Sequence, residues 1–165
     1  LITSYAFPRI LVVLSSIFAV LLSHLLEWAV LLAALVLMGV RPTLSWLALP
    51  WLIAVELSLA VGLSCLLSVL AVDIRDLERV WGLFLYGFFF LTPIFYTTQA
   101  IGGPALPLVA LNPLTWIIEM TRAVVIGGSY HLPSDALAPA AAILAFCAVS
   151  LSFFGRLSRG IVERL

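Results

Sequence analysis

The chain has 165 residues, of which 64% are hydrophobic and only 10% are charged. A water-soluble domain typically carries about 25% charged residues, so this composition excludes a soluble globule and indicates an integral membrane protein. Eight arginines balance eight acidic residues and lysine is absent, so the net charge of zero gives no support to a nucleic-acid partner.

Four stretches are candidates for membrane-spanning helices, since a span needs about 20 predominantly apolar residues. They cover residues 11–38, 47–71, 80–96 and 136–154. The charged turn before the third stretch contains Asp73 and Asp76, either of which can cap the helix that follows. We place the end of the third span near Tyr96, because prolines and a Gly-Gly pair follow it.

The apolar segment after the third span is interrupted by Pro104, Pro107 and Pro113. It also carries Glu119 and Arg122, which are costly at the bilayer centre. Irregular backbone at membrane depth is tolerated where protein or a water-filled cavity surrounds it. We therefore predict a re-entrant hairpin over residues 104–127 rather than a fifth full span.

The arginines support this topology. With four spans both ends lie on one side of the membrane, and six of the eight arginines lie there: Arg9, Arg75, Arg79, Arg156, Arg159 and Arg164. The other side holds Arg41 and Arg122. The positive-inside rule then places both ends in the cytoplasm, whereas a fifth span would put the last three arginines outside. The predicted fold is an all-α integral membrane protein, a single domain over residues 1–165, with four transmembrane helices and a re-entrant outer hairpin.

Three ionisable residues lie inside the predicted spans: His24 and Glu27 in the first, and Glu56 in the second. His24 and Glu27 are three residues apart, so they share a helix face. An acid within a span is a candidate for a functional site, such as a proton pathway. Structural pairing is the alternative, and we favour it because a proton relay normally uses more such groups.

Small residues recur at every fourth position of the second span, at Ala54, Ser58 and Gly62. This spacing allows helix backbones to approach closely. It is compatible with a dimer or gating seam, but ordinary packing within the helix bundle is the favoured interpretation.

The third span is rich in aromatic residues, and Phe84, Phe88 and Phe95 share a face at helical spacing, with Tyr96 next in the chain. Such rings could stack on the sugars of a substrate in a channel. Packing against lipid or neighbouring helices is the alternative for any one of them.

The segment before the first span, Leu1–Arg9, is too short to cross a membrane and contains Tyr5, Phe7, Pro8 and Arg9. It could lie at the interface or dock a cytoplasmic partner. The sequence has no phosphate-binding loop of the GxxxxGK[ST] type and no spacing typical of a metal site. We therefore expect no cofactor and no metal on this chain, and any ATP would be bound by another one.

The order of these features resembles one family. FPRI leads into a long span, DIRDLERV follows the next span, then come FFFLTPIFY and, after a loop, LNPLTWIIEMTRAVVIGG. This pattern resembles the permease subunits of ABC exporters of the second type, particularly the branch that exports O-antigen, capsule or teichoic-acid polysaccharides. The resemblance covers nearly the whole chain and corresponds to the last two thirds of such a permease.

The resemblance implies a six-span permease, so two spans would precede Leu1. It implies a homodimer in the inner membrane that works with ABC ATPase subunits, which bind ATP and magnesium. Residues 1–10 would be the coupling segment, with Tyr5, Phe7, Pro8 and Arg9 against the ATPase. Asn112 and Pro113 would form the turn of the outer gate hairpin, with Glu119 and Arg122 in its return helix. Phe84, Phe88, Phe95 and Tyr96 would lie along the translocation path.

The functional hypothesis is a conduit for a lipid-linked polysaccharide that performs no covalent chemistry. A drug or lipid exporter of the same type is the alternative within transport. A proton-coupled carrier using His24, Glu27 and Glu56 is an alternative of another class. An intramembrane enzyme is a third, although the paired carboxylates or histidine clusters that such enzymes use are not seen in the sequence.

Overall fold

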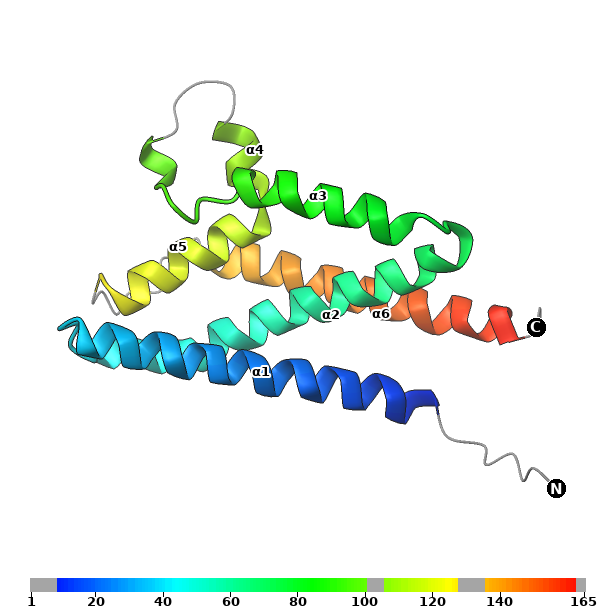
Figure 1. Ribbon diagram of the computed structural model, residues 1–165, viewed down its shortest axis with the longest axis horizontal. Helices are drawn as coiled ribbons and strands as arrows, with labels where there is room; N and C mark the ends of the chain where they lie inside the picture. Colours follow the sequence, from blue (N-terminus) through cyan, green and yellow to red (C-terminus); the bar gives the residue numbers. More distant parts are fainter. Residues whose placement is uncertain (1–8, 101–105, 128–135, 163–165) are drawn as a thin grey trace. The chain divides into compact units, whose positions relative to one another are not determined.

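A computed structural model describes residues 9–100, 106–127 and 136–162, and in these ranges all regular structure is helical. Within these ranges six α-helices and two short 3₁₀ helices follow one another. Figure 1 shows their arrangement. Their bounds are α1 Arg9–Leu37, η1 Leu44–Ala48, α2 Leu49–Asp73, α3 Leu77–Leu91, η2 Thr98–Ala100, α4 Leu106–Leu111, α5 Pro113–Val125 and α6 Leu137–Val162.

Three of the helical segments are long and apolar enough to cross a membrane: Phe18–Leu37, Leu44–Val72 and Leu137–Arg156. They fall within three of the four predicted spans or extend them slightly. The prediction of an all-α membrane protein is therefore confirmed. Helix α3 contains only 15 residues, fewer than a full span requires, so the number of spans stays a prediction.

Helix α3 ends at Leu91, and the predicted end at Tyr96 is wrong. Thr92, the residue after it, has extended backbone angles of φ −88° and ψ 129°. Pro93 explains this, because a proline disfavours the helical conformation of the residue before it. Asp76 occupies the N-cap position of α3, but its side chain makes no capping hydrogen bond.

The described residues fall into two units, one reaching to Pro42 and the other beginning at Thr43. Helix α1 belongs to the first unit and ends in a Schellman motif. The amide of Gly39 donates to the carbonyl of Val36, and the amide of Val40 donates to that of Leu35, both at 3.0 Å. Gly39 has a φ of +92°, a conformation that glycine adopts without a Cβ clash.

The second unit is built on the crossing of α2 and α6, which make its most extensive contact (Figure 1). Its core contains Val55 and Leu59 of α2, Ile117 of α5, and Ala140 and Ile143 of α6. The indole rings of Trp51 and Trp116 meet edge to face beside this core, 6.0 Å apart between centroids. The core therefore joins α5 to both long helices.

Gly62 lies at a close contact between α2 and α6. A Cβ placed on Gly62 would be 3.0 Å from a ring carbon of Phe146 and 3.1 Å from the Cα of Cys147. Ser58 instead donates to the carbonyl of Ala54 on its own helix, and Ala54 is exposed. The small-residue spacing thus serves helix packing at Gly62 and forms no continuous seam within the described residues.

We predict that Gly62→Val lowers the free energy of unfolding by about 1–3 kcal/mol, because the added methyl groups force α2 and α6 apart. Reversible unfolding in mixed micelles measures this change. Gly82→Val is the matched control, since no atom lies within 4 Å of a Cβ at Gly82. Equal losses in the two variants would contradict the close approach at Gly62.

Candidate functional site

The break after α3 leaves several carbonyl groups without partners inside the helix, and nearby side chains satisfy them. Phe88 O accepts from both the amide and the hydroxyl of Thr92, at 3.0 and 2.7 Å. Phe90 O accepts from the hydroxyl of Tyr96 at 2.9 Å. The last turn of a helix always presents such carbonyls, and they need partners wherever water is excluded. Residues 92–96 therefore fold back on the end of α3.

Arg122 of α5 satisfies the next two carbonyls. Its guanidinium donates to Ile94 O at 2.6 Å and to Tyr96 O at 3.0 Å. The planar fork of arginine places two N–H groups in fixed directions, which suits two carbonyls that belong to residues two positions apart. The sequence analysis judged the charge of Arg122 to be costly at the bilayer centre. In the structure its side chain is half-buried and bonded to backbone oxygens.

Glu119 lies one turn before Arg122 on α5 and accepts a hydrogen bond from the hydroxyl of Thr98. Thr98 begins η2, which follows the segment that Arg122 holds. The two charged residues therefore attach the same stretch of chain, from Ile94 to Thr98, to one face of α5. The structure brings together Tyr96, Glu119 and Arg122, which the sequence had suggested separately.

Asn112 separates α4 from α5 and caps α5, its side-chain carbonyl accepting from the amide of Leu114 at 2.9 Å. Pro113 occupies the first helical position, where its missing N–H has no consequence. The amide nitrogen of Asn112 donates to the hydroxyl of Thr92 at 2.9 Å, and both residues are buried. Asn112 thus links the start of α5 to the break after α3.

The last carbonyls of α5 are satisfied from a distant part of the sequence. Ser45 donates to Val124 O at 2.7 Å, and the indole of Trp46 donates to Val125 O at 3.3 Å. Because Ser45 gives its proton to Val124, the hydroxyl of Thr43, 2.6 Å away, donates to Ser45 in turn. Helix α5 is therefore held at its start, along one face and at its end.

The sequence analysis missed four residues whose side chains form hydrogen bonds with α5 or its N-cap residue Asn112. They are Thr92, Thr98, Ser45 and Trp46. Thr92 could have been suspected, because a hydroxyl directly before a proline can close the helix by bonding back to the carbonyl four residues earlier. The other three carry no such signal. Two buried polar atoms on α5, the hydroxyl of Thr115 and the indole nitrogen of Trp116, have no hydrogen-bond partner in the structure.

The aromatic residues proposed for the translocation path divide into two groups. On α3, Trp81, Phe84 and Phe88 stack in sequence, with ring centroids 5.2 Å apart at each step. Phe95 lies beyond the end of α3 and meets Phe89 edge to face at 5.9 Å. The prediction that Phe95 shares the helical face of Phe84 and Phe88 is therefore wrong, because the helix ends at Leu91.

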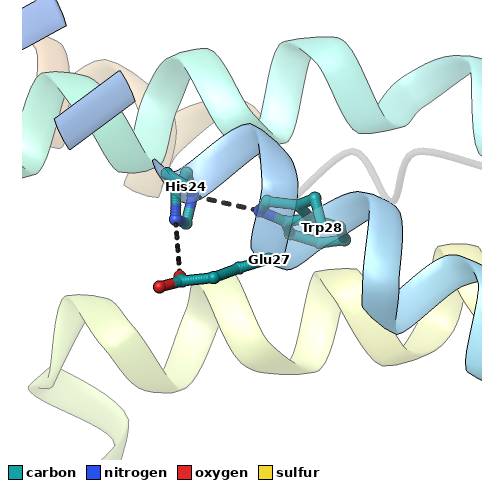
Figure 2. Close-up of polar contacts among 3 residues, drawn as sticks. All are labelled: His24, Glu27 and Trp28. Atoms are coloured by element: carbon teal, nitrogen blue, oxygen red, sulfur yellow. Dashed lines mark hydrogen bonds and ion pairs between the residues drawn. The ribbon is translucent and has the colours of Figure 1, made fainter. Parts of the chain in front are cut away.

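His24 on α1 lies between Trp28 and Glu27 (Figure 2). The indole of Trp28 donates to Nε2 of His24 at 3.0 Å, and Nδ1 of His24 is 3.6 Å from Glu27. An indole nitrogen only donates, so Nε2 acts as an acceptor and the ring proton is on Nδ1, facing the carboxylate. His24 thus contacts both Glu27 and Trp28 on its own helix, and the role of this group stays a prediction.

The remaining predicted residues carry less structural information. Tyr5, Phe7 and Pro8 lie outside the described residues, and Arg9 is the first residue of α1. Glu56 is half-buried on α2, next to the core residue Val55. Within the described ranges no three His, Cys, Asp or Glu side chains are grouped so that they could hold a metal ion.

Comparison with known families identifies the chain. Residues 1–126 match the family described as ABC-2 type transporter, which is well over half of the sequence. The chain belongs to the ABC-2 type transporter family. Members of this family are membrane-embedded transport subunits, so the resemblance seen in the sequence is confirmed and an enzymatic role is not supported.

Two curated relatives of this ABC-2 chain come from Klebsiella pneumoniae, and both are named O-antigen export system permease protein RfbA. One is 32% identical over 123 residues, which cover 74% of this chain and 48% of the relative. The other is 28% identical over 160 residues, which cover 96% of this chain and 61% of the relative. The chain therefore spans roughly half to three fifths of the length of these relatives.

We predict that Arg122→Lys in this ABC-2 chain lowers the free energy of unfolding by about 1.5–3 kcal/mol, the usual contribution of a hydrogen bond to a charged group. An ammonium group cannot span the two carbonyls that the guanidinium holds. Amide hydrogen exchange across residues 94–98 should accelerate in parallel. Arg79→Lys, on the exposed first turn of α3, is the control, and equal exchange in the two variants would show that Arg122 does not hold this segment.

We predict that Asn112 and Thr92 are energetically coupled. A double-mutant cycle with Asn112→Ala and Thr92→Val should give an interaction energy of about 0.5–3 kcal/mol, because each substitution removes their shared bond. The control cycle pairs Asn112→Ala with Ser152→Ala, whose hydroxyl bonds within α6. Additive losses in the first cycle, matching those in the control, would refute the link between α5 and the break after α3.

Proposed function

We propose that this chain is part of the permease of an ATP-driven exporter for a lipid-linked polysaccharide of the O-antigen, capsule or teichoic-acid type. Family membership supports the transport role, and the two similar permeases, named for O-antigen export, support the substrate class. The observation that carries the proposal is the attachment of α5 to the break after α3 by Asn112, Glu119 and Arg122.

In this proposal α4 and α5 form the re-entrant outer gate, beside four spans that include α3. The polar groups that hold residues 92–98 to α5 are hydrogen-bond donors and acceptors of the kind that sugar hydroxyls also use. A passing glycan can therefore replace these bonds when the gate opens, so opening does not leave a charged group bare in the membrane. Phe84, Phe88, Phe95 and Tyr96 offer aromatic faces to the sugar rings along this path.

We assign the step that drives transport, the binding and hydrolysis of ATP, to partner chains. Two copies of the permease would work with ABC ATPase subunits that bind ATP and magnesium, in the inner membrane, with both ends of this segment in the cytoplasm. Tyr5, Phe7, Pro8 and Arg9, in residues 1–10, would contact the ATPase. Tyr5, Phe7 and Pro8 precede α1 in the sequence and Arg9 is its first residue. This supports the proposal, because a push on the start of a long helix is transmitted along it as a rigid element.

Depletion of the full protein in its host tests this function. We expect lipid-linked glycan to accumulate on the cytoplasmic leaflet and surface glycan to disappear, as measured by leaflet-resolved extraction, and re-expression should restore both. Unchanged surface glycan would contradict the polysaccharide proposal. If the protein instead exports a drug or a lipid, depletion would alter the efflux of that compound. Transport that persists without the ATPase and is abolished by Glu56→Gln would indicate the proton-coupled carrier instead.

A further inference from the structure

Glu119 and Arg122 carry opposite charges and lie three residues apart on one face of α5. Side chains at this spacing on a helix are neighbours, and a glutamate that precedes the basic residue is in the favourable order. In the described structure, however, the two side chains form no ion pair with each other. Glu119 accepts from the hydroxyl of Thr98. Arg122 donates to the carbonyls of Ile94 and Tyr96. Two charges that can satisfy each other are therefore both used to hold another segment.

We call that segment, residues 94–98, the strap. The chain directly before it is fixed, since Thr92 and Pro93 are buried. The hydroxyl of Thr92 also donates to the end of α3 and accepts from the side chain that caps α5. No residue of the strap itself is buried within this chain. The strap is thus anchored at its start and held along its length by polar bonds to α5, which allows it to leave α5 while the anchor stays in place.

Release of the strap has a cost that depends on the two charges. Both side chains are half-buried, and a charge that is partly removed from water is costly without a partner. Because Glu119 and Arg122 are neighbours, each can turn to the other as soon as the strap departs. An ion pair on the same face of α5 then replaces the bonds to the strap.

We propose that the strap, Glu119 and Arg122 form a partner-exchange latch with two states. In the closed state, which the structure shows, both charges bind the strap. In the released state they bind each other. With this pair available the strap can leave α5 before any glycan arrives, so the latch is independent of the exported substrate.

Amide hydrogen exchange across the strap measures how often it leaves α5. The full protein is compared with its variants in nanodiscs of phosphatidylethanolamine and phosphatidylglycerol. Thr98→Val removes the closed-state bond to Glu119, so strap exchange should become about tenfold faster, as expected for loss of a hydrogen bond to a charged group. This substitution leaves the carboxylate able to pair with Arg122.

The decisive variant adds Glu119→Gln to Thr98→Val. In the Thr98→Val background the strap no longer uses the carboxylate, so the second substitution acts on the released state. We expect strap exchange about two- to fivefold slower than with Thr98→Val alone, because release no longer gains an ion pair. Glu78→Gln in the same background is the matched control, since Glu78 is exposed in the first turn of α3, and it should change nothing.

Two results would overturn the latch. Strap exchange that is unchanged or faster after Glu119→Gln is added would mean that the released charges do not pair with each other. An equal slowing by Glu78→Gln would mean that the effect reports general charge and not this pair. Thr98→Ala supplies the same background if Thr98→Val prevents folding. Glycan export is not measured here, so a failure of the polysaccharide proposal would leave this result unaffected.

Discussion

The structure depends on one constraint, which is that a backbone polar group away from water must find its partner within the protein. Helices meet this demand internally, but α3 stops at Leu91 and α5 starts only at Pro113. The side chains of Thr92, Tyr96 and Arg122 satisfy the carbonyls exposed by the break, and Asn112 satisfies an amide at the start of α5. What resembles an irregular loop in sequence is therefore an ordered set of bonds, and it fixes where α5 lies relative to α3.

Much of this arrangement could be anticipated from residue types. Long apolar runs predicted α1, α2 and α6, because span length is set by the thickness of the bilayer. Charges in an apolar setting drew attention to Glu119 and Arg122, and the family resemblance implied a turn at Asn112 and Pro113, where α5 begins. The end of α3 was placed near Tyr96, beyond Pro93, whereas the helix already ends at Leu91, two residues before that proline. The partners of Arg122 could not be predicted, because every residue has a carbonyl and only the fold selects Ile94 and Tyr96.

Helix α5 also connects parts of the second unit that sequence separates widely. Its start is bonded to residue 92, its charged face to residues 94–98, and its end to Ser45 and Trp46 of η1, just before α2. On its remaining face, Ile117 packs into the core with α2 and α6. A displacement of α5 must therefore break polar bonds at several places together, which is the behaviour expected of an element with two discrete positions rather than a continuous range.

The bonds from Ser45 and Trp46 to the end of α5 join residues 79 positions apart. During synthesis α2 enters the membrane well before α5 exists, since chains are made from the amino terminus. The two donors are then already in place at the start of α2 when Val124 and Val125 arrive. The donors are thus made before the carbonyls that they bond, and a circular permutation that made α5 before α2 would leave the last carbonyls of α5 without these donors at the moment of insertion.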